Sequence, residues 1–128
     1  TRRGGYIMGD RANFGFKQNN GDTLFLYGHW AGHNMLGNLA AALTAAEPRW
    51  GDSSYATRIA TSYLIGEDWK STTGWGFSIN RLDDNEHKVP VVNWEAQTVT
   101  LFEEDLTTVV AKFGIAEFVN KYTLVSVD

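Results

Sequence analysis

The chain has 128 residues, of which 43% are hydrophobic and 13% aromatic, and its formal net charge is −4. That length and apolar content suffice for one domain with its own core. The acidic balance argues against nonspecific binding to nucleic acid, which depends on clustered Lys and Arg. Cysteine is absent, which excludes disulfides, thiolate nucleophiles and sulfur-ligated zinc. No window approaches the roughly 20 apolar residues of a membrane span, so we expect a soluble, cytoplasmic protein.

Residues 1–7 differ in character from the rest of the chain. We expect them to be an N-terminal appendage, either a natural arm or residues placed ahead of a natural start at Met8. Residues 8–128 are then expected to form a single α+β domain. At its beginning, residues 12–17 predict a short strand, and the polar residues 18–22 predict the turn of a hairpin.

Residues 23–46 carry the strongest structural signal, an apolar segment that runs through two histidines into an Ala- and Leu-rich stretch. The period-2 pattern of Leu24, Leu26 and Trp30, with apolar residues also in between, predicts a central strand covered on both faces. A helix is predicted to begin near His33. The residues expected on its buried face are Leu36, Leu39, Ala40, Leu43 and Ala46.

Residues 52–66 predict a second helix, after the break that Pro48 imposes on the first. Asp52 or one of the two serines that follow it can cap the N-terminus, and Gly66 can end the helix. A polar loop is expected next. The buried face of this helix is predicted to comprise Ala56, Ile59, Ala60, Tyr63 and Leu64.

The next segment alternates in polarity. Trp75, Phe77 and Ile79 are separated by small or polar residues, which predicts a strand with one buried face. Residues 83–88 are mostly charged and predict a solvated hairpin turn. Their carboxylates are a possible set of cation ligands, but the spacing does not fit a calcium loop and the required glycine is missing.

Residues 89–94 and 98–102 are rich in β-branched side chains and predict a second hairpin, in which Pro90 favours an edge strand or the start of a strand. Residues 124–127 predict a final strand. Together the segments predict an α+β fold, with an antiparallel sheet of about five strands packed with two main helices and a short C-terminal helix. The short helix is predicted from Ile115, Phe118, Val119 and Tyr122.

The histidine pair is the first candidate for chemistry. His29 and His33 are four residues apart, but Gly32 between them argues against one continuous helix that would place both on one face. The glutamate of a zinc-protease helix is absent. We therefore interpret His29 as an imidazole that is hydrogen-bonded at the end of a strand, and we predict no metal and no cofactor. A general base at His29, with or without His33 and a metal, is the alternative.

The five tryptophans supply a second set of candidates. Trp30, Trp75 and Trp94 fall in predicted strands and are expected in the core, whereas Trp50 and Trp69 fall in loops and are expected to be partly exposed. Exposed Trp near Arg or Lys is typical of binding surfaces. The candidate binding residues are Tyr27, His29, Trp30, His33, Asn34, Trp50 and Trp69.

Three segments carry a resemblance to known proteins. Residues 8–13 (MGDRAN), 26–32 (LYGHWAG) and 85–92 (NEHKVPVV) resemble small uncharacterised proteins of bacteriophages, notably those that infect actinobacteria. The resemblance covers residues 8–102 and implies a phage accessory product made in the host cytoplasm. It also implies a natural start at Met8. It carries no catalytic residues, and it leaves the N-terminal extension unexplained.

Three functions follow as hypotheses. The leading one is a noncatalytic accessory protein that binds a host protein or a small ligand, because aromatic residues are abundant and a recognisable catalytic set is missing. The alternatives are a small hydrolase that uses His29 and a structural component of a virion. We expect neither a membrane nor nucleic acid as a partner, and self-association stays open.

Overall fold

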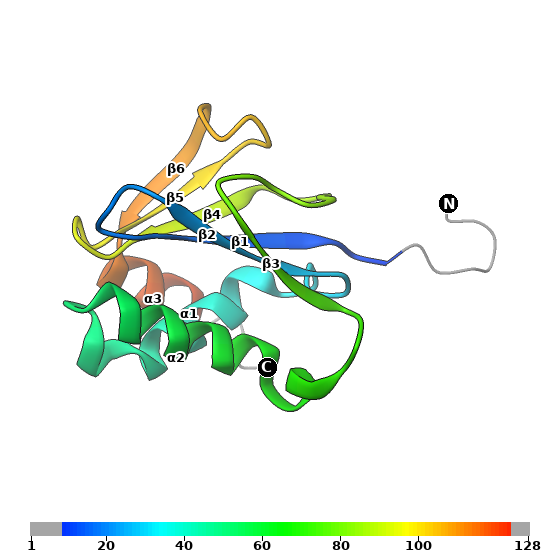
Figure 1. The fold of residues 1–128 in the computed structure, drawn as a ribbon. Coiled ribbons are helices and arrows are strands. Elements are labelled where there is room, and N and C mark those ends of the chain that lie inside the picture. The colour runs from blue at the N-terminus through cyan, green and yellow to red at the C-terminus, as the bar shows by residue number, and fades with distance from the viewer. Residues whose placement is uncertain (1–8, 124–128) are drawn as a thin grey trace.

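The computed structural model describes residues 9–123, which form a six-stranded mixed sheet with three α-helices on one face (Figure 1). The predicted α+β class is confirmed. The strand order is β3-β2-β1-β4-β5-β6. The elements are β1 (Ala12–Lys17), β2 (Thr23–Gly28), α1 (Met35–Ala45), α2 (Ser53–Ile65), β3 (Trp75–Ile79), β4 (Val89–Asn93), β5 (Thr98–Phe102), β6 (Val109–Gly114) and α3 (Ile115–Thr123), with short 3₁₀ helices η1 (Glu47–Arg49) and η2 (Gly66–Lys70).

The helix layer follows from the apolar patterns of the sequence. α1 contacts both α2 and α3, and its side chains Leu39 and Leu43 lie buried against the sheet residue Leu26 in one core cluster. Asp52 caps α2, because its Oδ1 accepts a hydrogen bond from the backbone N–H of Tyr55 at 3.2 Å. The predicted positions of all three helices are confirmed.

The sequence predicted an antiparallel sheet, but the sheet is mixed. β1 pairs with β2 in the antiparallel sense but with β4 in the parallel sense, at Gly15↔Val91 and Phe16↔Val92. The sixth strand, β6, was not predicted, because its sequence VVAKFG does not alternate in polarity. The hairpin of β4 and β5 is confirmed, and Pro90 lies ahead of the first β1 partner, where a missing N–H costs least.

The prediction of a hairpin turn at residues 83–88 is wrong. β3 and β4 lie on opposite sides of the β1–β2 pair, so residues 80–88 form a crossover between them (Figure 1). Asn13, which is fully buried, holds this crossover because its Nδ2 donates hydrogen bonds to Asp84 O at 2.9 Å and Asn85 Oδ1 at 3.1 Å. The charged segment is therefore packed onto the sheet through the backbone of Asp84 and the side chain of Asn85.

Four residues that were predicted to be buried are exposed. Phe77 and Ile79, expected on a buried face of β3, are each 54% exposed. Trp30 lies beyond the end of β2 and is 58% exposed, whereas Trp94 is buried as expected. Tyr63 is 53% exposed, because the buried face of α2 is rotated towards small residues. These small residues are Ala56, Thr57, Ala60 and Thr61.

The expected appendage at residues 1–7 and the expected strand at residues 124–127 lie outside the described residues. Across residues 9–123, no helix combines the length and the apolar character needed to cross a membrane.

Two glycines on the face away from the helices give a matched test of the sheet. A Cβ at Gly15 would lie 2.8 Å from Phe25 Cε1 and 3.0 Å from Val91 Cγ2, whereas a Cβ at Gly76 would meet nothing within 4 Å. We expect Gly15→Ala to lower the free energy of unfolding by about 1–3 kcal/mol through overpacking. Gly76→Ala should stay within about 0.5 kcal/mol of the wild type. Denaturant unfolding measures both, and equal effects would contradict the close approach at Gly15.

Candidate functional site

A groove of about 660 Å³ lies between the edge strand β3 and helix α2. Leu24, Phe77 and Ile79 form its apolar sheet side, and polar residues of the β1–β2 turn close one end. Its volume falls within the range typical of ligand sites. We call it the β3–α2 groove. From α2 it is lined by Ser53, Ser54, Thr57, Arg58 and Thr61.

The position of α2 explains why the groove stays open. Thr57 Oγ1 accepts hydrogen bonds from Trp94 Nε1 at 2.9 Å and from Gln18 Nε2 at 3.0 Å. Trp94 follows β4, and Gln18 follows β1, so α2 is attached over the middle of the sheet. Phe77 and Ile79 on the edge strand are therefore left half-exposed, although they share a face with the core residue Leu26.

The outer edge of β3 also lacks a neighbouring strand among the described residues. The bonds His29 N–H to Gly74 O and Asn80 N–H to Thr23 O flank the β2–β3 ladder. Because hydrogen bonding alternates along an antiparallel strand, the backbone groups of Phe77 point away from β2. The same alternation applies to the backbone of Trp75 and Ile79, so the groove has a hydrogen-bonding edge beside its apolar floor.

A second cavity, of about 250 Å³, lies between the sheet and the C-terminal half of α2. The aromatic side chains Trp30, Tyr63 and Trp75 are among those that line it, and we call it the aromatic pocket. Trp75 is the first residue of β3, so the pocket adjoins the end of the β3–α2 groove. The other lining residues are Phe14, Ala31, His33, Asn38 and Leu64.

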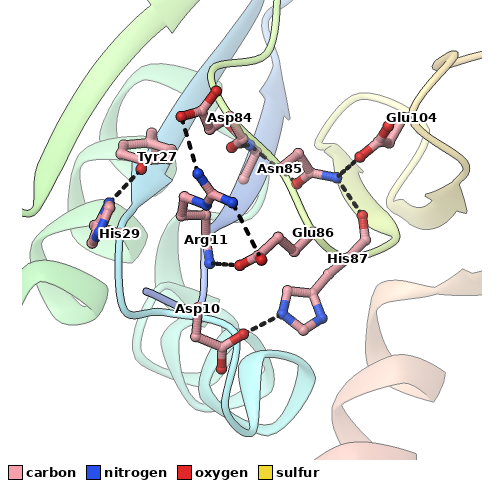
Figure 2. Close-up of polar contacts among 10 residues, drawn as sticks. Asp10, Arg11, Tyr27, His29, Asp84, Asn85, Glu86, His87 and Glu104 are labelled. Carbon is pink, nitrogen blue, oxygen red and sulfur yellow. Dashed lines mark hydrogen bonds and ion pairs between the residues drawn. The ribbon is translucent and has the colours of Figure 1, made fainter. Parts of the chain in front are cut away.

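A polar cluster gathers where β1 begins, on the crossover side of the sheet (Figure 2). Glu86 accepts a hydrogen bond from the backbone N–H of Arg11 at 2.8 Å and forms an ion pair with its guanidinium at 3.3 Å. These contacts hold the pKa of Glu86 below its ordinary value, the backbone bond contributing most. The bond to Glu86 raises the pKa of Arg11. Asp84 adds a second ion pair to Arg11, also at 3.3 Å.

The same cluster holds a histidine–carboxylate pair. His87 Nε2 lies 2.6 Å from Asp10 Oδ1 (Figure 2). Gly32 makes room for this pair, because a Cβ there would overlap both His87 Nε2 and Asp10 Oδ1. The backbone N–H of Gly32 donates to Asp10 O at 2.8 Å, and the N–H of Asp10 donates to His29 O at 2.8 Å. The loop after β2 is therefore fixed against the start of β1.

The predicted histidine pair is divided between two sites. His29 Nδ1 lies 2.8 Å from Tyr27 Oη, and its ring packs edge-on against Trp30 with centroids 4.8 Å apart. Burial raises the pKa of Tyr27, and nearby Asp84 adds to the effect. His33 is exposed and lines the aromatic pocket. Within residues 9–123, no group of three or more His, Asp or Glu side chains is arranged to hold a metal ion.

The other predicted site residues Asn34, Trp50 and Trp69 do not lie with either histidine. Asn34 precedes α1 in the left-handed conformation, with φ of 54°. Trp50 is partly buried against the core and donates its indole N–H to Leu43 O at 2.9 Å. Trp69, in η2, is 74% exposed, as expected for a loop tryptophan. The seven predicted residues therefore do not form a single site.

None of the groove residues was predicted from the sequence as a binding residue. The alternation of Trp75, Phe77 and Ile79 was visible, but it indicates only that these side chains share a face, not whether a helix covers that face. The contribution of Tyr63 to the aromatic pocket was hidden in the same way, since it was assigned to the core.

Comparisons of the chain with protein-family models, with curated proteins and with solved structures found no match.

The lowered pKa of Glu86 predicts a pH dependence. A carboxylate whose folded-state pKa lies below its ordinary value of 4.5 stabilises the fold above that pH, and the stabilisation is lost as the pH falls through the folded-state pKa. We expect Glu86→Gln to be less stable than the wild type at neutral pH, with the difference shrinking below pH 4.5. Thermal unfolding across pH 3–7 measures this effect, which these surface contacts keep modest.

The control for that series is Glu67→Gln, in η2, because the Glu67 carboxylate makes no hydrogen bond or ion pair within the described residues. A constant difference between wild type and Glu86→Gln across the pH range would contradict the predicted role of Glu86.

His29 gives a further test, because its hydrogen bond to Tyr27 indicates a structural role. We expect His29→Gln and Tyr27→Phe each to lower stability by about 0.5–1.5 kcal/mol through loss of that bond. The double variant should cost less than the sum, since both changes remove the same bond. Chemical denaturation of the four proteins gives the coupling energy, and strict additivity would contradict the assignment.

Proposed function

We propose that this chain is a noncatalytic binding protein that holds an extended segment of a partner protein along β3, in the β3–α2 groove. The observation that carries the proposal is the exposure of Phe77 and Ile79, each 54%, on the sheet face that elsewhere forms the core. Exposed apolar side chains that gather beside a concave surface are typical of interaction sites. A partner side chain in the groove would remove them from water.

The two edges of the sheet support this choice. β3 has the sequence WGFSI, with no charged residue, no proline and no bulge, so it lacks the usual devices that prevent strand addition. β6 carries Lys112 and follows an irregular register against β5 at Phe102. An extended segment that pairs with β3 would form main-chain hydrogen bonds, and its alternate side chains would enter the groove.

The charges of the groove indicate the chemistry of the segment. Arg58 lines the groove, and its guanidinium makes no ion pair within the described residues. The carboxylate of Asp22, by contrast, is engaged by Asn20 Nδ2 at 3.1 Å and Asn80 Nδ2 at 3.0 Å. We expect a segment with two apolar residues two positions apart and an acidic residue that reaches Arg58.

The resemblance to phage proteins adds a biological setting to the proposal. On that resemblance, the partner is a protein of the infected host, and binding takes place in the host cytoplasm. A small apolar ligand is the competing occupant of the groove.

Selection from a random nine-residue peptide display library on the immobilised protein tests the proposal. We expect the enriched peptides to share apolar residues at positions i and i+2 together with an acidic residue. A synthetic peptide of that sequence should bind the wild type and lose at least about tenfold in affinity with Phe77→Asp or Ile79→Asp, because an introduced carboxylate makes the apolar floor polar. Isothermal calorimetry gives the dissociation constants.

Two controls sharpen that test. Val109→Asp and Val110→Asp place the same charge on exposed valines of β6, at the other edge of the sheet, and should leave binding unchanged. Peptides N-methylated at alternate positions should bind only when the methyl groups point away from β3. Equal losses from the β6 and β3 variants, or indifference to N-methylation, would contradict strand addition.

A further inference from the structure

The aromatic pocket has a composition that the groove does not explain. Trp30 and Tyr63, 58% and 53% exposed, face a cavity into which the side chains of His33 and Asn38 also open. Among the described residues, no Lys or Arg lines it. Its volume of about 250 Å³ is below the usual range for small-molecule sites but sufficient for the end of one side chain.

Two other exposed aromatic rings, those of Tyr55 and Trp69, already have a cation over them. Arg49 Cζ lies 4.6 Å from the ring centroid of Tyr55, and Lys70 Nζ lies 5.9 Å from that of Trp69. Within residues 9–123, no Lys or Arg is placed in this way over Trp30 or Tyr63. Trp30 and Tyr63 therefore have no cation from the described residues, and unlike Phe77, which also has none, they line the pocket.

The polar groups around the pocket also favour a cationic guest. The carboxylate of Asp68 accepts a hydrogen bond from Trp75 Nε1 at 3.2 Å, which places a negative charge behind one wall. The amide oxygen of Asn38 and a ring nitrogen of His33 can accept hydrogen bonds from a guest that enters the pocket. A planar guanidinium satisfies both features, because it stacks on aromatic faces and donates several hydrogen bonds in its plane.

We propose that the aromatic pocket binds the guanidinium group of an arginine side chain. The identification of that arginine as part of the partner segment held on β3 rests on the proposed function. Trp75 belongs both to β3 and to the pocket wall, so an arginine near the Trp75 end of the segment reaches the pocket. The groove would then select apolar residues, and the pocket would select the charge that fixes the direction of the segment.

The pocket is tested without any peptide by titrating the whole protein with N-acetyl-arginine methylamide and, separately, with its neutral citrulline analogue. We expect the arginine probe to shift the indole N–H signals of Trp30 and Trp75 in NMR spectra. The citrulline probe should bind about 3- to 30-fold more weakly, the range that a cation–π contribution gives. Equal binding of the two probes, or no binding of the arginine probe, would overturn the assignment.

Substitutions locate the site. Trp30→Ala and Tyr63→Ala should each weaken the arginine probe several-fold, whereas Trp69→Ala, a more exposed tryptophan outside the pocket, should leave it unchanged. Unchanged unfolding midpoints confirm that each variant is folded. An effect of Trp69→Ala as large as that of Trp30→Ala would show nonspecific association with surface tryptophans and would also overturn the proposal.

These experiments test peptide binding in the groove and guanidinium binding in the pocket independently of each other. Phe77→Asp should abolish peptide binding but leave the arginine probe bound, which supports the pocket independently of the groove. In peptides selected on the wild type, replacing arginine with citrulline should weaken binding to the wild type but not to Trp30→Ala. Selected peptides that bind through the groove and are insensitive to this replacement would overturn the link between the pocket and the segment.

Discussion

The hydroxyl oxygen of Thr57 accepts two hydrogen bonds inside the interface between α2 and the sheet, from the indole of Trp94 and from the amide of Gln18. Thr57 is itself nearly buried, so leaving either donor unpaired would carry a desolvation cost. This pair of bonds sets where α2 lies across the strands. The groove beside β3 and its apolar floor follow from that placement, because a helix shifted outwards would cover Phe77 and Ile79. Arg58, whose guanidinium makes no ion pair within the described residues, lines the groove for the same reason.

The polar cluster has a different role from the groove. Asp10, Arg11 and Asn13 bind the crossover through Asp84, Glu86 and His87, and each contact joins segments more than 70 residues apart in sequence. The tight contacts at Gly32 leave little room for a guest there. We interpret the cluster as a structural element that holds the crossover against β1. The proposed partner then binds on the opposite face of the sheet.

The sequence predicted elements better than it predicted their surroundings. The spacing of Leu39 and Leu43 and the cap at Asp52 act locally, so the helices could be located from the chain alone. The parallel joint of β1 and β4 depends on a crossover, for which residues 83–88 give no signal beyond their charge. For the site, the period of Phe77 and Ile79 indicated the correct face, but their exposure depends on where α2 is attached, through partners distant in sequence.

The parallel joint between β1 and β4 has a consequence for the way the sheet is divided. On either side of it lies a three-stranded antiparallel unit, β3-β2-β1 and β4-β5-β6. The second unit is a meander of consecutive strands, whereas β2 and β3 of the first are separated in sequence by α1 and α2. The joint itself has three residue pairs, Gly15↔Val91, Phe16↔Val92 and Lys17↔Asn93. Because parallel pairing is slightly weaker per residue and this joint is short, the side chains that bridge it help to hold the two units together. Thr57 of α2 is one of them, since it accepts hydrogen bonds from Gln18 after β1 and from Trp94 after β4. The helix side of the groove is therefore attached across the joint, so a separation of the two units would also disturb the groove.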